Sequence, residues 1–370
     1  MPIKLISVVG ARPNFMKIAP IAAAIDQTGG FTNLLVHTGQ HYDEKLSRIF
    51  FDELGIPKPD VNLGIGSGTR EEQIEKIMNA FEPLVLSENP DAILVVGDVN
   101  STIACARVAK THGVKVIHVE AGLRSFDKAM PEEHNRVATD KISDYLFVTE
   151  QSGMDNLAQE QVPGRRFLVG NVMIDNLVRS LPKVSKSTIR ESLGLQEQQY
   201  LVATFHRPSN VDKREDLDKL IDTLEQLCQR TTVVLPLHPR TRQSMASHGL
   251  TKRMDGVSGL VTVDPLGYLD FLRLVTGALG VVTDSGGIQE ETTYLGIPCL
   301  TMRENTERPI TIDVGTNVLI GADRQRLLSE LDQVIAGTFK SGAQPPLWDG
   351  LAAPRIVEIL RNELGAEKLT

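Results

Sequence analysis

Residues 92–119 read AILVVGDVNSTIACARVAKTHGVKVIHV, and this stretch decides the fold. Ala92–Gly97 is a short apolar run rich in β-branched residues, which predicts a buried strand. Thr102–His112 places apolar residues three and four positions apart, the spacing of a helix with one buried face. Lys115–Val119 is a second apolar run. Strand, helix and strand in close succession predict parallel strands joined by a helix that packs on the sheet.

The same alternation extends over the whole chain. Further strands are predicted at residues 3–9, 34–37, 145–148, 167–169, 201–205, 232–235, 260–263, 279–283, 299–301 and 317–320, and further helices at 18–27, 43–54 and 71–86. The pattern weakens in the polar, serine-rich segment 182–199, and 370 residues are too many for one compact core. We therefore expect two Rossmann-like, doubly wound α/β domains, residues 1–181 and 182–370, with a final helix at Ala353–Glu363 that could pack on either.

Composition excludes several classes of function. The net charge is −8 and no basic run occurs, which argues against a nucleic-acid binder. No apolar run reaches the roughly 18 residues that span a bilayer, and the N-terminus does not resemble a signal peptide. The three cysteines form neither a metal pair nor a disulfide framework. These features predict a cytosolic protein in a reducing compartment, with no membrane partner.

The first predicted strand is followed by Gly10-Ala11-Arg12-Pro13. In doubly wound sheets, ligands bind outside the carboxyl ends of the strands, so polar residues at these ends are candidates for the site. A dinucleotide fingerprint needs three spaced glycines, and only Gly10 is present, which argues against NAD. Arg12 can instead extend its planar guanidinium towards a diphosphate, although a solvent-facing arginine is the alternative.

Carboxylates follow the next strands of the first domain. Asp98 comes directly after Gly97, and Glu120 stands at the tip of the following strand. A simpler interpretation makes Asp98 a first-turn acid of a helix capped by Asn100 or Ser101. Two carboxylates at successive strand tips favour a functional role. Glu132 follows Pro131 at a helix start and could place a third carboxylate above them.

The second domain carries the residues suited to phosphate. His206 ends its first strand, where an imidazolium would stabilise a leaving diphosphate, although a structural histidine is the alternative. Ser285-Gly286-Gly287 joins a buried strand to a helix, so backbone N–H groups can approach phosphate oxygens. Glu290 or Glu291, one turn later, could accept hydrogen bonds from ribose hydroxyls. The segment 302–309 adds further cations.

Together these groups suggest acid–base chemistry on a nucleotide-diphosphate sugar. An N-acetyl sugar has no ring carbonyl beside C2, so an enolate route is closed, and transient oxidation would need a nicotinamide site. Elimination remains: a carboxylate removes the C2 proton while the diphosphate leaves C1, and re-addition delivers a proton to the opposite face.

The motifs, in their order and spacing, resemble the non-hydrolysing UDP-N-acetylglucosamine 2-epimerases. The resemblance rests on Gly10-Ala11-Arg12-Pro13, Gly39-Gln40-His41, Gly97-Asp98, His118-Val119-Glu120-Ala121-Gly122-Leu123-Arg124, Pro131-Glu132-Glu133, Gly170-Asn171, His206-Arg207, Asp284–Glu291 and Thr306-Glu307-Arg308-Pro309. It implies two Rossmann-like domains facing across a cleft in the B-type glycosyltransferase architecture, a homodimer, and no redox cofactor or required metal. It also implies a cytoplasmic isomerase that serves polysaccharide biosynthesis.

Residue roles are carried over from the resemblance by motif. It implies a catalytic group of Asp98, Glu120, Glu132 and His206, and substrate contacts from Arg12, Lys17, Arg136, Phe271, Ser285, Gly286, Gly287, Glu291 and Arg308. Tyr42 and Pro208 depart from the arginines of family members that their own substrate regulates, so a regulatory site is not carried over. The short segment 125–130 suggests a different sugar pocket, as in the diacetamido uronic acid branch.

Three other functions compete with epimerisation. A glycosyltransferase of the same fold would need an acceptor pocket and would not need three carboxylates around the sugar. A hydrolysing 2-epimerase would release free N-acetylmannosamine when water captures the glycal. A catalytically silent nucleotide-sugar sensor is disfavoured because the acid–base positions are intact.

Overall fold

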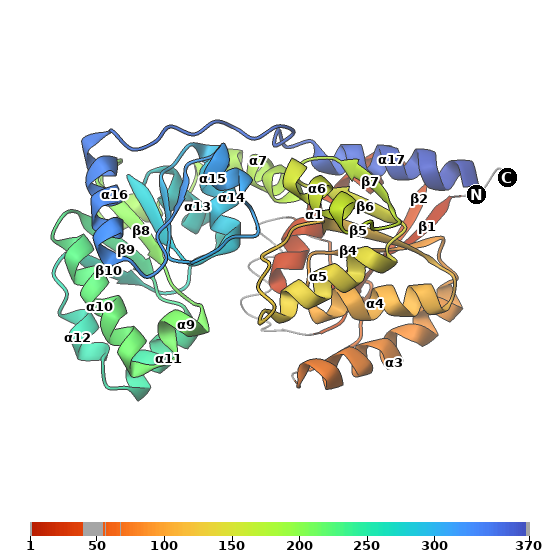
Figure 1. Cartoon of the computed structure of the whole chain (residues 1–370), viewed down its shortest axis with the longest axis horizontal. Helices are drawn as coiled ribbons and strands as arrows, with labels where there is room; N and C mark the ends of the chain where they lie inside the picture. The colour runs from red at the N-terminus through yellow and green to blue at the C-terminus, as the bar shows by residue number, and fades with distance from the viewer. Residues whose placement is uncertain (1, 40–54, 56, 67, 368–370) are drawn as a thin grey trace. The chain divides into compact units, whose positions relative to one another are not determined.

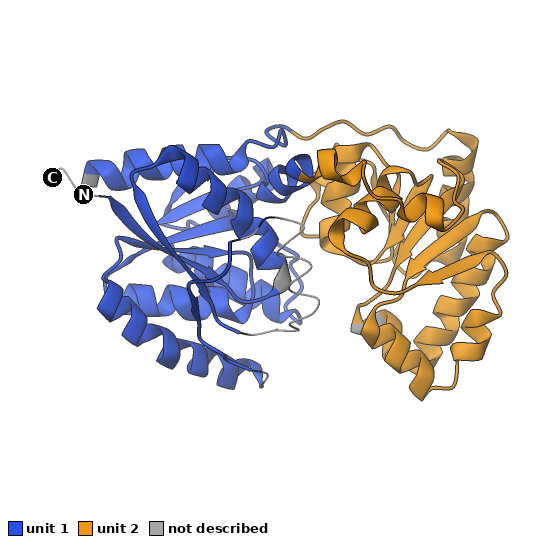
Figure 2. Cartoon of the chain, turned by 180° about the vertical axis from the view of Figure 1, so that it is seen from behind, with its two compact units in different colours: residues 1–179, 346–370 blue, residues 180–345 orange. Residues whose placement is uncertain are grey.

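The computed structural model describes residues 2–39, 55, 57–66 and 68–367. These residues belong to two compact units, which we call unit 1 (1–179 and 346–370) and unit 2 (180–345) (Figure 2). The predicted helix at 43–54 and the motif residues Gln40, His41 and Tyr42 lie outside the described residues. No helix in the described part of the chain is long and apolar enough to cross a membrane.

Unit 1 is built on a seven-stranded parallel sheet with the order β3-β2-β1-β4-β5-β6-β7 (Figure 1). Its strands are β1 (Ile3–Val9), β2 (Phe31–His37), β3 (Val61–Asn62), β4 (Ala92–Val96), β5 (Lys115–Ala121), β6 (Tyr145–Val148) and β7 (Arg165–Leu168). Its helices are α1 (Arg12–Thr28), α3 (Arg70–Glu88), α4 (Asn100–Thr111), α5 (Pro131–Ile142), α6 (Gln151–Gln159), most of α7 (Val172–Val184) and α17 (Ala352–Glu367).

The central strands are buried on both faces, which explains their continuous apolar sequence. All of β4 is buried, and Ile93 and Val95 pack in a core cluster with side chains of α3 and α4, such as Ile77 and Ile103. Helix α3 starts with a capping box, in which Thr69 and Glu72 satisfy each other's backbone N–H groups. The capping residues and the buried apolar side chains of α3 therefore favour the same helix.

The C-terminal helix α17 belongs to unit 1 and packs against α1. Its start is held by Asp175, whose two carboxylate oxygens accept hydrogen bonds from the backbone N–H groups of Ala352 (3.0 Å) and Ala353 (2.6 Å). Nearby, the buried Trp348 donates from Nε1 to the Thr149 carbonyl at 3.2 Å.

Unit 2 is built on a six-stranded parallel sheet with the order β10-β9-β8-β11-β12-β13. Its strands are β8 (Tyr200–Thr204), β9 (Thr232–Pro236), β10 (Leu260–Val263), β11 (Gly280–Thr283), β12 (Cys299–Thr301) and β13 (Asn317–Leu319). Its helices are the end of α7, α8 (Ile189–Ser192), α9 (Pro208–Val211), α10 (Arg214–Cys228), α11 (Pro239–Ser247), α12 (Thr251–Asp255), α13 (Tyr268–Thr276), α14 (Gly286–Leu295), α15 (Ile310–Asp313) and α16 (Arg324–Ala336).

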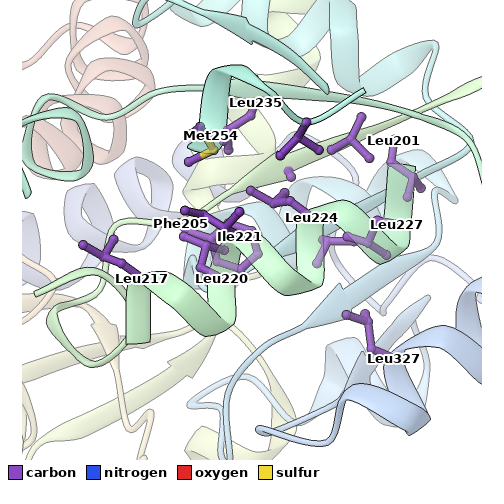
Figure 3. Packing of buried hydrophobic residues seen from close by; sticks show 14 of the residues in the cluster. Leu201, Phe205, Leu217, Leu220, Ile221, Leu224, Leu227, Leu235, Met254 and Leu327 are labelled. Carbon is purple, nitrogen blue, oxygen red and sulfur yellow. The ribbon is translucent and has the colours of Figure 1, made fainter. Parts of the chain in front are cut away.

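Successive side chains of β8 point to opposite faces of the sheet, so unit 2 has one core cluster on each face. Leu201 and Ala203 pack in one cluster with the apolar side of α10 and with Leu327 of α16 (Figure 3). Tyr200 and Val202 pack in the other cluster with Leu274 of α13 and with part of α14. Both faces are thus covered by helices, as the apolar runs predicted.

Two local expectations differ from the structure. The predicted domain boundary at residues 181 and 182 falls inside a helix, because α7 continues to Val184. Pro182 has no N–H for the carbonyl four residues earlier, so α7 lacks one hydrogen bond in its last turn and ends two residues later. Asn100 and Ser101 do not cap α4, because Val99 is the N-cap; Ser101 Oγ instead contacts Thr38 Oγ1 at 2.7 Å.

Candidate active site

Glu120 has an unusual backbone conformation at the carboxyl end of β5. Its φ of 72° lies in the left-handed region, and the pairing register between β5 and β6 shifts between Val119 and Ala121. A non-glycine residue in such a conformation costs roughly 1–3 kcal/mol and persists only where its surroundings enforce it. Strain of this kind is common at functional sites, and here it aims one carboxylate out of the strand.

Lys17 of α1 forms an ion pair with the Glu120 carboxylate. The Lys17 and Glu120 side chains are 10% and 6% exposed, so this is a nearly dry pair. Gly97, at φ 66°, leaves room for it, because a Cβ at that position would lie 2.9 Å from Lys17 Nζ and 3.7 Å from Glu120 Oε2. The glycine is therefore needed for both its conformation and its lack of a side chain.

Asp98 forms an ion pair with Arg136 of α5. Arg136 also donates to Glu133 Oε2 at 2.6 Å, so it joins the end of β4 to the start of α5. Asn135 supports the same turn, because its Nδ2 donates to the Asp98 carbonyl at 3.0 Å. Asp98 is thus held in place by a side-chain contact with Arg136 and a backbone contact with Asn135.

Glu132 and Glu133 are adjacent but have different surroundings. Glu133 is buried and accepts hydrogen bonds from Ser125 N (2.9 Å), Ser125 Oγ (2.9 Å) and Phe126 N (3.1 Å). Glu132 is exposed. Glu133 therefore holds the 125–126 loop and Arg136, whereas Glu132 remains accessible to a substrate.

In unit 2, the helix α14 begins where the Ser-Gly-Gly segment was expected to bind phosphate. Ser285 is its N-cap but makes no side-chain capping hydrogen bond, which is contrary to a simple capping role. A Cβ on Gly286 would lie 3.1 Å from Arg308 NH1, so the guanidinium lies against the first turn. The uncapped N–H groups and the arginine together suit a phosphate group.

Arg308 is itself held by two acids, Glu290 and Glu307. Glu307 also pairs with Arg303 at 2.8 Å. Burial of Glu307 opposes its ionisation, but the hydrogen bond from Arg303 and the charges of both arginines outweigh burial and lower its pKa to about 2. Arg308 is therefore oriented before any ligand arrives.

His206 follows β8 and is held from behind by Asp284. Its Nδ1 lies 2.8 Å from Asp284 Oδ1, while its side chain is 44% exposed. The same carboxylate accepts from the backbone N–H groups of His206 and Arg207, both at 3.0 Å, and from Asn210 Nδ2 at 2.9 Å. Burial of Asp284 opposes its ionisation, but its hydrogen bonds, led by the one with His206, lower its pKa overall. Asp284 thus orients the imidazole through Nδ1 and leaves the His206 side chain partly exposed.

Glu291 is buried one turn into α14 and accepts a hydrogen bond of 2.9 Å from the Tyr268 hydroxyl. Burial raises the pKa of Glu291 to about 7; the Tyr268 hydrogen bond opposes this rise, and the charge of Glu290 adds a smaller rise. Phe271, on the same helix as Tyr268, is half-buried and packs on the core cluster around Val275.

The family model for UDP-N-acetylglucosamine 2-epimerase matches residues 23–361. The chain belongs to this family. The UDP-N-acetylglucosamine 2-epimerase of Methanocaldococcus jannaschii is 38% identical over 363 residues, which cover 96% of this chain and 98% of that protein. The UDP-2,3-diacetamido-2,3-dideoxy-D-glucuronate 2-epimerase of Pseudomonas aeruginosa is 37% identical over 362 residues, which cover 96% and 99%.

A crystal structure of the M. jannaschii UDP-GlcNAc 2-epimerase in complex with UDP-GlcNAc and UDP is similar to this epimerase-family chain throughout. The TM-score is 0.89 at 37% identity, and the match covers 97% of this chain and 100% of that one. With its two parallel sheets, the chain has the predicted α/β fold of the B-type glycosyltransferase class. The predicted family is also confirmed.

The structure of this epimerase-family member groups many of the predicted residues. It pairs Lys17 with Glu120 and Asp98 with Arg136 in unit 1, and it places Arg308 against Gly286 in unit 2. Arg12 begins α1, but its side chain is outside the described part of the structure.

The supporting groups Asp284, Tyr268, Arg303 and Glu307 were not among the predicted site residues. Asp284 had a signal, since it stands between a buried strand and the Ser-Gly-Gly turn. His238 is the N-cap of α11, where its ring accepts from the Arg240 N–H at 3.2 Å.

Proposed function

We propose that this enzyme interconverts UDP-N-acetylglucosamine and UDP-N-acetylmannosamine by inverting C2. The observation that carries the proposal is the placement of Asp98 just after β4 and of Glu120 at the carboxyl end of β5. These two strands pair with each other, and each carboxylate lies beside a cation. In a chain of the UDP-N-acetylglucosamine 2-epimerase family, two carboxyl groups at neighbouring strand ends are suited to accept and return a proton.

The reaction proceeds by elimination and re-addition. A carboxylate takes the C2 proton, the electron pair forms the C1–C2 double bond, and the C1–O bond to UDP breaks. The products of this step are UDP and 2-acetamidoglucal. A proton is then delivered to the opposite face of C2 while UDP re-adds at C1. Atoms and charge balance without an electron acceptor, because only a proton and UDP are transferred.

The leaving UDP carries negative charge that positive groups must stabilise. His206, backed by Asp284, and Arg308, backed by Glu290 and Glu307, are suited to this role. We assign catalysis to Asp98, Glu120, Glu132 and His206, and substrate binding to Arg12, Lys17, Arg136, Phe271, Ser285, Gly286, Gly287, Glu291 and Arg308.

A more heavily substituted sugar is the second candidate substrate. The relative named for UDP-2,3-diacetamido-2,3-dideoxy-D-glucuronate is nearly as similar to this chain as the one named for UDP-N-acetylglucosamine, at 37% and 38% identity. The short 125–130 segment favours the substituted sugar. It leads into Pro131 and Glu132 and is pinned by Glu133 at Ser125 and Phe126.

The test is to incubate the enzyme with each nucleotide sugar separately and to follow the anomeric protons by NMR. Conversion of UDP-N-acetylglucosamine into its C2 epimer supports the proposal. Conversion of only the diacetamido uronate would show that the enzyme belongs to the diacetamido uronic acid branch of the family. Steady release of free N-acetylmannosamine would instead identify a hydrolysing epimerase.

We also propose, from the family resemblance, that the enzyme is a cytoplasmic homodimer that supplies a polysaccharide pathway. Light scattering coupled to gel filtration tests the dimer directly. A single species at the monomer mass of 40.6 kDa would reject it.

A further inference from the structure

A buried group of side chains lies beneath the candidate carboxylates of unit 1. His118, on β5, has its Nδ1 2.7 Å from Asp140 Oδ1 and its Nε2 2.8 Å from the Gly97 carbonyl oxygen. Both side chains are fully buried. The two contacts fix the orientation of the His118 ring from both of its nitrogens.

Asp140 holds the chain on both sides of the strained Glu120, through the side chain of one residue and the backbone of another. Asp140 Oδ1 contacts the side chain of residue 118, and Asp140 Oδ2 accepts from the Gly122 N–H at 3.1 Å. The residues two before and two after Glu120 are therefore fixed to one carboxylate. Such a double attachment is the kind of restraint that a left-handed glutamate requires.

The same group also reaches the turn that carries Asp98. The Gly97 carbonyl accepts from His118, and Gly97 N donates to the Val119 carbonyl at 3.1 Å. On α5, Asp140 stands one turn after Arg136, which pairs with Asp98. One buried pair thus connects β5, the end of β4 and α5.

We infer that His118 and Asp140 are positioning residues that hold Glu120 and Asp98 in register for proton transfer at C2. This inference rests on the proposed function. Both side chains are fully buried and act through the backbone of residues 97 and 122. Misplacement of a catalytic group by about 1 Å can cost about 10²-fold in rate, so the pair should affect turnover far more than nucleotide binding.

Two substitutions at residue 118 separate its two contacts. An asparagine amide can reach the place of Nδ1, so His118→Asn keeps the Asp140 contact and frees the Gly97 carbonyl. A glutamine amide can reach the place of Nε2, so His118→Gln keeps the Gly97 contact and frees Asp140. In both variants Asp140 still accepts from Arg124 at 2.8 Å and from Gly122, which protects the fold.

The control is Ser143→Ala. Ser143 is also buried on the α5 side of unit 1, and its hydroxyl donates within its own chain segment, to the Thr139 carbonyl at 2.8 Å. The Ser143→Ala variant loses one buried hydrogen bond, and this bond does not involve His118 or Asp140.

The experiment measures kcat, UDP affinity, melting temperature and the fraction of turnovers that release free UDP and 2-acetamidoglucal. Both His118 variants should lose about 10- to 100-fold in kcat, bind UDP within about twofold of wild type, and release more glycal, because re-protonation is misaligned. Ser143→Ala should keep the wild-type kcat and the wild-type fraction of turnovers that release glycal.

The inference would be overturned if the His118 variants fold and show the wild-type kcat and the wild-type fraction of turnovers that release glycal. A loss of kcat that only follows lost UDP affinity or melting temperature would also overturn it, because it would mean a structural role alone. If the wild-type enzyme itself failed to epimerise, the proposed function would fail instead.

Discussion

Gly97 and Lys17 are packed so closely that a Cβ on residue 97 would lie 2.9 Å from Lys17 Nζ. The Gly97→Ala substitution should push the Lys17 ammonium away from Glu120 and impose a left-handed alanine at φ 66°. We expect the free energy of unfolding to fall by about 1–2 kcal/mol from the conformation alone. We expect kcat to fall about 10²-fold from the displaced ion pair.

Gly113→Ala is the matched control for this change, because Gly113 has φ 70° and no atom within 4 Å of its Cβ position. It should lose similar stability and keep full turnover. Equal kcat in the two alanine variants would show that the Lys17–Glu120 geometry does not matter.

Glu132→Gln and Glu133→Gln should have opposite effects. Glu132 is exposed, so its amide should leave the melting temperature unchanged and lower kcat by about 10²–10⁴-fold. Glu133→Gln weakens the contacts with Ser125 and Arg136 and should lower the free energy of unfolding by about 1–3 kcal/mol. Turnover assays and thermal melts on both variants decide between them. The reverse pattern would make Glu133 the acid–base residue.

Arg308→Lys should weaken UDP binding without unfolding the site. Lysine keeps a positive charge beside Glu290 but loses the planar guanidinium that lies against Gly286. We expect calorimetry to show UDP affinity reduced roughly tenfold, or about 1.4 kcal/mol. Arg326→Lys, the same exchange at an exposed position of α16, is the control and should leave UDP affinity unchanged. Unchanged affinity in Arg308→Lys would remove this arginine from the phosphate site.

Glu291 predicts a pH dependence of stability. Burial raises its folded pKa to about 7 from an ordinary value of 4.5, so between these values the folded state binds more protons at this group than the unfolded state. Stability from this group is therefore full below about pH 4.5 and is lost as pH rises through about 7.

Denaturant melts across this pH range on wild type and Glu291→Gln test the dependence. The glutamine variant should show a smaller loss of stability on going from acid to neutral pH. Parallel curves for the two proteins would mean that Glu291 does not titrate in this window.

Sequence patterns predicted the two parallel sheets because buried strands such as β4 are recognisable as short apolar runs between helical segments. They also predicted that Asp98 and Glu120 stand at the tips of successive strands. Chain order alone does not make successive strands neighbours, because β3 and β4 are separated in the sheet, whereas β4 and β5 pair. The left-handed backbone of Glu120 was not predictable, because glutamate rarely adopts it and only the surrounding contacts enforce it. The pairing of His206 with Asp284 depends on the neighbouring positions of β8 and β11, which apolar periodicity does not specify.

The most direct test of the account is epimerisation in heavy water, followed by NMR of C2 in the product. If a carboxylate removes the C2 proton and the opposite face is re-protonated, the epimer must carry solvent deuterium at C2, with a trace of UDP and 2-acetamidoglucal after long incubation. Epimerisation that retains the original C2 hydrogen would contradict the elimination mechanism and the roles assigned to Asp98 and Glu120.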